Sequence, residues 1–240
     1  MAARSSSHCF DAALEAARIA ITYRTPVILL SDTFLANSSE PWLVPSAADV
    51  PRIDPRFATR PNTEDGQFLP YMRDDRGARP WAVPGTPGLQ HRVGGLEKDD
   101  VTGNISYEPD NHQRMTDLRA AKIAGIDVPA LEVEDPSGDA ELLVLGWGST
   151  YGPIGGAVRR VRKRGGKVAI AHLGHLNPLP RNVGDVLRRY RRVLLPETNM
   201  GQLSKMLRAE FLVDIESLTK VTGLPFSTEE LEAAMEERCR

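Results

Sequence analysis

The stretch from Glu141 to Ala209 decides the fold: ELLVLGWGSTYGPIGGAVRRVRKRGGKVAIAHLGHLNPLPRNVGDVLRRYRRVLLPETNMGQLSKMLRA. Three short apolar runs alternate here with three segments of helical pattern, which predicts the order βαβαβα. Strands that alternate with helices of about 10 to 15 residues indicate a parallel sheet with right-handed crossovers. The expected elements are strand Glu141 to Trp147, helix Pro153 to Arg164, strand Lys167 to His172, helix Val183 to Tyr190, strand Arg192 to Pro196 and helix Gly201 to Ala209.

Shorter elements flank this core. Apolar residues at helical spacing between Phe10 and Ile21 predict an amphipathic helix near the N-terminus. Pro26 to Asp32 is a short apolar run that ends in small polar residues, which is typical of a buried parallel strand opening into a functional loop. Further elements expected are a helix from Pro109 to about Gly125, a short strand at Asp214 to Glu216 and a final helix capped at Ser227.

The segment from Pro41 to about Asn111 has a different character. It contains ten of the eighteen prolines and no sustained hydrophobic period. Irregular stretches of this length are uncommon in compact domains and tend to be functional or to form interfaces. Phe68, Tyr71 and Trp81 argue against disorder, because solvated linkers are poor in such residues. We therefore expect a long, ordered, irregular connector.

Composition limits the classes of protein that remain. With 240 residues and 41% hydrophobic residues, the chain can bury a core, and no apolar run approaches the roughly 20 residues of a membrane span. The N-terminus lacks the apolar segment of a secretory signal, so we expect a cytoplasmic location and no membrane contact. Cys9 and Cys239 are the only cysteines. Because a four-iron cluster normally takes about four thiolates, any such cluster must lie on another subunit.

Positive charge is concentrated between Arg159 and Arg192, where eleven Lys or Arg residues accompany one acidic residue, Asp185. Solvated helix faces explain such a run in most proteins. A docking surface for an acidic carrier protein or a phosphorylated cofactor is the alternative. We expect no nucleic-acid partner, because aromatic residues do not interleave with the basic ones and no nucleic-acid motif is present.

Several motifs carry a family resemblance. Tyr23 to Trp42, YRTPVILLSDTFLANSSEPW, resembles the end of the pyrimidine-binding domain in alpha subunits of the 2-oxoacid:ferredoxin oxidoreductases, especially the 2-oxoglutarate type. The further matches are Gly94 to Glu97, Pro109 to His112 with Met115 and Arg119, His172 and Leu173 with Leu176 to Pro178, and Glu197 to Leu203. Together they cover nearly the whole chain.

The resemblance implies a fold and a division of the chain. The expected fold is α/β: a parallel-sheet domain similar to the C-terminal domain of transketolases, preceded by a remnant of a pyrimidine-binding domain and the irregular connector. The implied domains are residues 1–43 for the end of the thiamine-diphosphate pyrimidine-binding domain, 44–138 for the connector with one helix, and 139–240 for the transketolase-like domain.

The resemblance also implies a function. Members of this family carry out thiamine-dependent oxidative decarboxylation of a 2-oxoacid, here 2-oxoglutarate, with transfer of the acyl group to coenzyme A and of electrons to ferredoxin. A companion beta subunit is expected to carry thiamine diphosphate, Mg²⁺ and an iron-sulfur cluster, and none of these is expected on this chain alone. The alternative is a noncatalytic assembly module derived from the same subunit.

No catalytic residue and no metal ligand is assigned. The chain begins about where the pyrimidine-binding domain ends, so the family's substrate motif and activating carboxylate are not found in it. Glu40 lies in the trailing loop and is interpreted as a structural or interface carboxylate.

The candidate cofactor-binding loop residues follow the apolar run that begins at Pro26. They are Ser31, Asp32, Asn37 and Ser38. Ligands bind at the carboxyl ends of strands in open α/β sheets, which favours a site here. Asx and Ser residues also organise turns, so loop structure alone explains them equally well.

Three other polar groups are weaker candidates. Gly146 to Gly152 lies between a strand and a helix but lacks nucleotide-binding spacing, and we interpret it as a structural loop. His172 and His175 have i, i+3 spacing without a Cys or acidic companion, so we expect structural histidines. Glu197, Thr198 and Asn199 are expected to organise the backbone at an interface.

Overall fold

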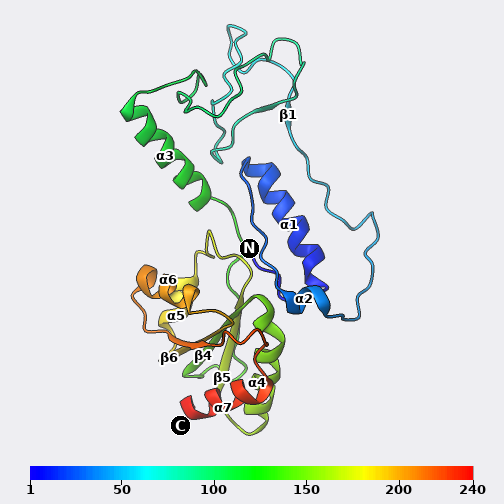
Figure 1. The fold of residues 1–240 in the computed structure, drawn as a ribbon, viewed down its shortest axis with the longest axis vertical. Helices are drawn as coiled ribbons and strands as arrows, with labels where there is room; N and C mark the ends of the chain where they lie inside the picture. The colour runs from blue at the N-terminus through cyan, green and yellow to red at the C-terminus, as the bar shows by residue number, and fades with distance from the viewer. Residues whose placement is uncertain (240) are drawn as a thin grey trace. The chain divides into compact units, whose positions relative to one another are not determined.

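The chain is described by a computed structural model covering residues 1–239 (Figure 1). It forms two compact units, which are described separately. The first unit combines residues 1–13, residues 28–43 and the chain from Val128 onward; the second combines residues 14–27 and 44–127. The helix α1 (His8–Tyr23), which the sequence predicted, contributes to both.

A five-stranded sheet forms the centre of the first unit. Its strand order is β3-β5-β4-β6-β7, and all neighbours are parallel except β3, which is antiparallel to β5. The strands are β3 (Val133–Glu134), β4 (Leu142–Trp147), β5 (Val168–Leu173), β6 (Arg192–Glu197) and β7 (Glu216–Thr219). The predicted α/β fold with a mostly parallel sheet is therefore confirmed.

Helices cover both faces of this sheet because β4 is apolar on both. Side chains alternate between the two faces of a strand. Leu142 and Val144 pack toward α4 (Tyr151–Lys163) and α7 (Thr228–Arg238), whereas Leu143 and Leu145 pack toward α5 (Val183–Arg188) and α6 (Gln202–Phe211). Figure 1 shows the two helix pairs on opposite sides of the strands.

The predicted strand from Pro26 to Asp32 is wrong. Only an isolated bridge forms, between Leu30 and Ala2, followed by the short helix α2 (Thr33–Asn37). Backbone hydrogen bonds join Leu30 N to Met1 O at 2.8 Å and Ala3 N to Leu30 O at 3.1 Å. Among residues 1–239 no further strand lies beside this segment, so Ile28 stays 76% exposed and the run is not buried.

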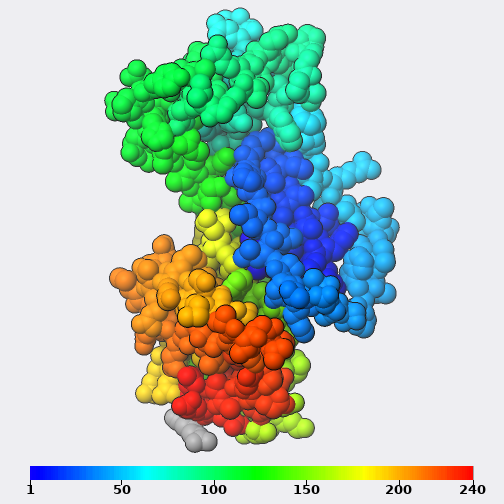
Figure 2. Space-filling model, in the orientation of Figure 1, coloured from blue at the N-terminus to red at the C-terminus, as the bar shows by residue number. Residues whose placement is uncertain are grey.

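The second unit contains residues 14–23 of α1, the helix α3 (Pro109–Ala124) and a pair of two-residue parallel strands, β1 (Phe57–Ala58) and β2 (Trp81–Ala82). Most of the remaining connector has no regular secondary structure, and turns and bends interrupt it. The cyan to green segment fills a continuous mass in the space-filling view (Figure 2). Buried Leu89 and the stacking of the Arg24 guanidinium 4.7 Å above the Trp81 ring agree with an ordered connector.

The basic stretch from Arg159 to Arg192 is largely paired within the first unit. Arg160 of α4 and Arg164, the residue that follows this helix, both contact Glu232 of α7, at 3.4 and 2.6 Å. Further pairs join the stretch to acidic residues elsewhere: Arg160 to Glu229, Arg162 to Glu134, Arg164 to Glu236, Lys167 to Asp139 and Arg191 to Glu141. This pairing favours a solvated, self-neutralised helix face over a docking surface.

Several bounds in the first unit differ from the predictions. The 3₁₀ turn η1 (Gly148–Thr150) leads directly into α4, so that helix begins at Tyr151 rather than Pro153. The last strand is β7, displaced from the expected Asp214 to Glu216, and β3 was not predicted. Within the part of the chain that the structure describes, no helix is long and apolar enough to cross a membrane.

Leu212 closes α6 in the left-handed conformation, with φ of 53°, and its side chain is 89% exposed. A non-glycine residue pays a steric penalty there that glycine does not. We expect Leu212→Gly to raise the free energy of unfolding by about 0.5–1 kcal/mol. Urea denaturation measures this free energy. The control is Leu224→Gly, at an exposed position without positive φ, which is not expected to raise the free energy of unfolding. Equal effects of the two variants would contradict the strain argument.

Candidate functional site

The strand order places a crevice between β4 and β6. The chain runs from β4 to β5 on one side and then crosses to β6 on the other. In open α/β sheets, ligands bind at such a switch point, outside the carboxyl ends of the strands. A cavity of about 200 Å³ lies there. It is lined by Ala2, Ala3, Leu30, Ser31, Asp32, Leu35, Trp147, Gly148, Ser149, Thr150, Thr198 and Asn199.

The Asp32 carboxylate lies at the entrance to η1. One oxygen caps α2 by accepting a hydrogen bond from Leu35 N at 2.9 Å, and the other accepts one from the Ser149 hydroxyl. Free amides at the start of a helix attract anions. The hydrogen bond from the Ser149 hydroxyl links the loop from Gly146 to Gly152 to the segment that begins α2, which favours the structural interpretation of that loop.

The four candidate loop residues separate into two pairs. Ser31 and Asp32 line the cavity, whereas Asn37 and Ser38 do not. The Asn37 side-chain amide donates to Thr33 O at 2.8 Å, and the Ser38 hydroxyl lies 2.8 Å from that of Ser6. Asn37 and Ser38 therefore have structural partners. Their assignment to a cofactor site stays a prediction, as does that of Ser31 and Asp32.

Glu40 lies outside the cavity. It accepts a hydrogen bond from the Ser7 hydroxyl at 2.5 Å, and this contact lowers the pKa of the exposed carboxyl. The contact joins the loop that follows α2 to the start of α1, in agreement with a structural carboxylate.

Glu197 directly precedes Thr198 and Asn199, which line the cavity. Its side chain is fully buried, and its two oxygens accept hydrogen bonds from Leu203 N and Ser204 N, both at 3.0 Å. Asn199 accepts one from Gly201 N at 2.7 Å. The carboxylate thus satisfies the first amides of α6, where the helix dipole favours negative charge. These contacts fit the predicted role in backbone organisation, and they also position Thr198 and Asn199 at the cavity wall.

Replacing Glu197 with glutamine removes the charge and turns one acceptor into a donor that faces an amide. We expect Glu197→Gln to lower the free energy of unfolding by about 1–3 kcal/mol, since a buried amide loses its partner. Urea denaturation provides the measurement. Glu210→Gln, at an exposed position near the end of the same helix, serves as the control and is expected to change it little. An unchanged stability of the Glu197 variant would remove the proposed capping role.

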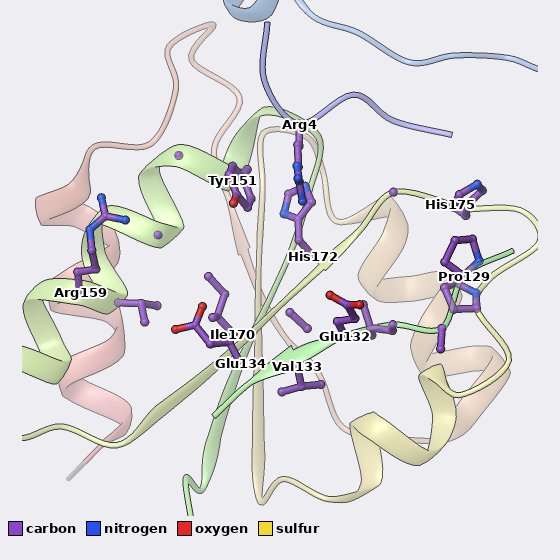
Figure 3. Close-up of a pocket in the computed structure, with 18 of the residues that line it drawn as sticks. Arg4, Pro129, Glu132, Val133, Glu134, Tyr151, Arg159, Ile170, His172 and His175 are labelled. Atoms are coloured by element: carbon purple, nitrogen blue, oxygen red, sulfur yellow. The ribbon is translucent and has the colours of Figure 1, made fainter. Parts of the chain in front are cut away.

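A larger cavity of about 730 Å³ lies beside β3, β5 and α4 (Figure 3). At its upper end the Arg4 guanidinium stacks 4.8 Å from the Tyr151 ring, and the His172 ring meets Tyr151 edge-on at 5.1 Å. Glu134 at the opposite end pairs with Arg162. Its charged lining is mixed, so the cavity does not select one ligand charge.

His172 is neutral at pH 7 in this environment. Burial lowers the pKa of His172 from its ordinary value of 6.5 to about 3, with smaller contributions from the charges of Arg4 and His8. Gly146 makes room for the ring, because a Cβ there would lie 2.8 Å from the imidazole Nδ1. Across residues 1–239, no group of three or more His, Cys, Asp or Glu side chains is arranged to hold a metal ion.

This pKa shift makes stability depend on pH. Between pH 6.5 and 3 the unfolded chain binds the proton and the folded chain does not, so the free energy of unfolding falls as pH falls, by at most about 1.4 kcal/mol per pH unit. We expect His172→Gln to make this fall shallower between about pH 6.5 and 4.5. Urea denaturation of both proteins at several pH values tests it. His91→Gln, at an exposed histidine, should leave the slope unchanged, and a parallel slope for His172→Gln would refute the effect.

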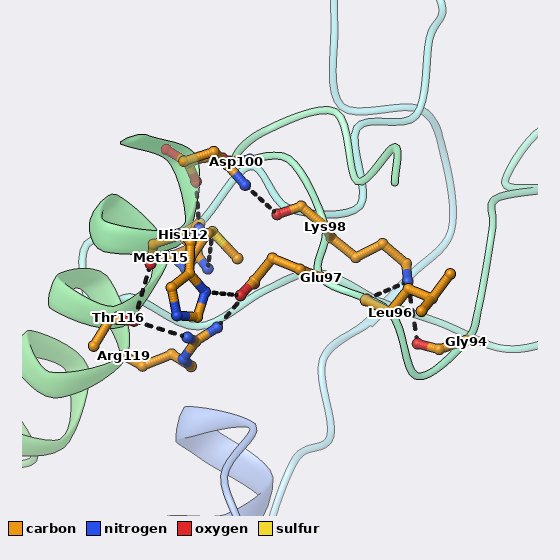
Figure 4. A network of polar contacts seen from close by, with 11 residues as sticks. Gly94, Leu96, Glu97, Lys98, Asp100, His112, Met115, Thr116 and Arg119 are labelled. Atoms are coloured by element: carbon orange, nitrogen blue, oxygen red, sulfur yellow. Dashed lines mark hydrogen bonds and ion pairs between the residues drawn. The ribbon is translucent and has the colours of Figure 1, made fainter. Parts of the chain in front are cut away.

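The second unit contains a polar network between the connector and α3 (Figure 4). Glu97 accepts hydrogen bonds from His112 at 2.6 Å and Arg119 at 3.2 Å. Asn111 donates to Lys98 O at 3.0 Å and accepts from Asp100 N at 3.1 Å. The segments from Gly94 to Glu97 and from Pro109 to Arg119, which the sequence linked only through the family resemblance, thus meet in space.

The protein defined by this fold and these sites is an α/β protein, and its similarities point to one enzyme group. Residues 1–108 match the family described as pyruvate flavodoxin/ferredoxin oxidoreductase, thiamine diphosphate-binding. The chain is 57% identical over 232 residues to the 2-oxoglutarate oxidoreductase subunit KorA of Mycobacterium tuberculosis, covering 96% of this chain and 35% of that protein. It is 35% identical to the alpha subunit of 2-oxoacid:ferredoxin oxidoreductase 1 of Aeropyrum pernix, covering 92% and 35%.

A solved structure is also similar. The 2-oxoglutarate:ferredoxin oxidoreductase of Magnetococcus marinus, determined with 2-oxoglutarate, coenzyme A and succinyl-CoA bound, superimposes with a TM-score of 0.91 at 30% identity. The match covers 100% of this chain and 42% of that chain. This chain spans only about a third of the length of the KorA subunit and of the Aeropyrum pernix alpha subunit.

Proposed function

We propose that this chain is part of the alpha subunit of a 2-oxoacid:ferredoxin oxidoreductase that uses 2-oxoglutarate. The complex would decarboxylate the 2-oxoacid oxidatively, pass the electrons to ferredoxin and form the acyl thioester of coenzyme A. The observation that carries the proposal is the 57% identity over 96% of the chain to a 2-oxoglutarate oxidoreductase subunit. The matched fold of the Magnetococcus marinus enzyme supports it independently of that relative.

The residues of this chain do not by themselves fit the cofactors of that reaction. Both cysteines are free, and no metal-binding group occurs among residues 1–239. The carboxylates at the switch point, Asp32 and Glu197, are already engaged by the chain's own hydroxyl and amide groups. Following the family resemblance, we assign thiamine diphosphate, Mg²⁺ and the iron-sulfur cluster to a companion beta subunit.

The finer parts of the proposal follow from the sequence resemblance. The chain would correspond to the C-terminal part of the subunit, with domains at residues 1–43, 44–138 and 139–240. Ser31 and Asp32 would lie near the cofactor-bearing partner, and the complex would be cytoplasmic, without membrane or nucleic-acid contacts. A noncatalytic assembly module derived from the same subunit is the alternative.

The test is purification of the tagged chain from its native cells, followed by an assay of the isolated complex. We expect co-purification of a subunit that contains thiamine and an iron-sulfur cluster, and reduction of ferredoxin that depends on 2-oxoglutarate and coenzyme A. With pyruvate in place of 2-oxoglutarate, kcat/KM is expected to fall at least about tenfold, since a site that pairs with a second carboxylate rejects a substrate lacking it.

The controls separate the two candidate functions. The companion subunit purified without this chain should be inactive if the chain completes the enzyme. Equal activity with and without the chain would favour the assembly module. A chain that purifies without any cofactor-bearing partner would contradict the oxidoreductase proposal.

A further inference from the structure

A cavity of about 330 Å³ in the second unit gathers positive charge. It lies among the connector residues around Tyr71 and Leu96 and the C-terminal half of α3. Five cationic side chains and one carboxylate, Glu97, are among the residues that line it. The cationic residues are Arg73, Arg79, Lys98, Arg119 and Lys122.

Two of these cations have carboxylate partners. Arg119 pairs with Glu97 at 3.2 Å, and Arg73 pairs with Asp100 at 2.5 Å. Glu97 also accepts a hydrogen bond from His112 at 2.6 Å, and this contact contributes most to lowering the pKa of the Glu97 carboxyl. Glu97, the carboxylate that lines the cavity, and Asp100, the partner of Arg73, are therefore both occupied.

The other three cations have no ion pair among residues 1–239. Lys98 is only 3% exposed, and its ammonium donates to Leu96 O at 2.7 Å and Gly94 O at 3.1 Å. Lys122 donates to Arg24 O at 3.1 Å. The Arg79 guanidinium lies 4.5 Å above the Tyr71 ring. Carbonyl groups and a ring satisfy some of the donors but do not neutralise the charges.

The arrangement leaves a local excess of positive charge. Burial, followed by the charges of Arg73, Arg79 and Arg119, lowers the pKa of Lys122. Lys98 is buried and Lys122 is half-buried, and buried cations without counter-ions are unfavourable, so an anion beside them relieves the repulsion. The unpaired cations line a cavity that is large enough for a small ligand and are not enclosed in a core.

We propose that this cavity binds the phosphate or diphosphate group of a small ligand, between Arg79, Lys98 and Lys122. Three unpaired cations match an anion that carries two or more charges better than a single carboxylate. A guanidinium donates two parallel hydrogen bonds to phosphate oxygens, and ammonium groups act as point charges around them. The site does not depend on the oxidoreductase function.

The experiment titrates the full chain with pyrophosphate at low salt by calorimetry. We expect saturable binding to the unmodified chain and at least about tenfold weaker binding to Arg79→Ala, because charged hydrogen bonds of about 1.5–3 kcal/mol are lost. Arg79 is exposed and stacks only on Tyr71, so this variant should fold. Lys122→Met is the second variant, and Arg92→Ala, at an exposed arginine outside the cavity, is the matched control.

The outcomes divide clearly. Weaker binding by both cavity variants with unchanged binding by Arg92→Ala supports the site. No binding of pyrophosphate at millimolar concentration, or equal weakening by all three variants, overturns it. Parallel titrations with inorganic phosphate and coenzyme A identify the kind of ligand. If coenzyme A binds more tightly than the inorganic anions, the site takes the phosphates of a nucleotide-type cofactor. If only the inorganic anions bind, the site takes a free anion.

Discussion

The alternation of side chains along β4 is the constraint on which the first unit depends. Its four apolar residues from Leu142 to Leu145 are almost completely buried, two on each face of the sheet. A strand of this kind is stable only when both faces are covered, which requires crossover helices on both sides. The sheet grows from β4 first toward β5 and then toward β6, and this change of side, with the crevice between β4 and β6, follows from placing α4 on one face and α5 on the other.

Carboxylates of the chain complete that crevice. Asp32 reaches the start of η1, and Glu197 reaches the start of α6. Helix N-termini in α/β proteins commonly hold the anionic part of a ligand. In this chain Glu197 already occupies such a position at the start of α6. The unpaired cations of the second unit are therefore the place where an external anion can bind.

Sequence pattern predicted the first unit well because the physics there is local. Apolar runs, Pro153 and Gly165 mark strands and helices without knowledge of their neighbours. The prediction of a strand from Pro26 to Asp32 failed because the burial of a strand depends on what lies beside it. A pattern of apolar residues does not reveal whether a neighbouring strand exists. The cavity at Arg79, Lys98 and Lys122 was also missed: these cations are 43 residues apart at most in the sequence (122 − 79) and converge only through irregular turns.

The segment that follows α1 in the first unit has a consequence for the isolated protein. Ile28, Leu30, Phe34 and Leu43 expose apolar side chains, and the only bridge of Leu30 is to Ala2. Unpaired backbone at an apolar edge is a template for pairing with another chain, and it favours aggregation unless a partner covers it. We therefore expect the isolated chain to self-associate through residues 28–43, and charged substitutions at Ile28 to reduce this association.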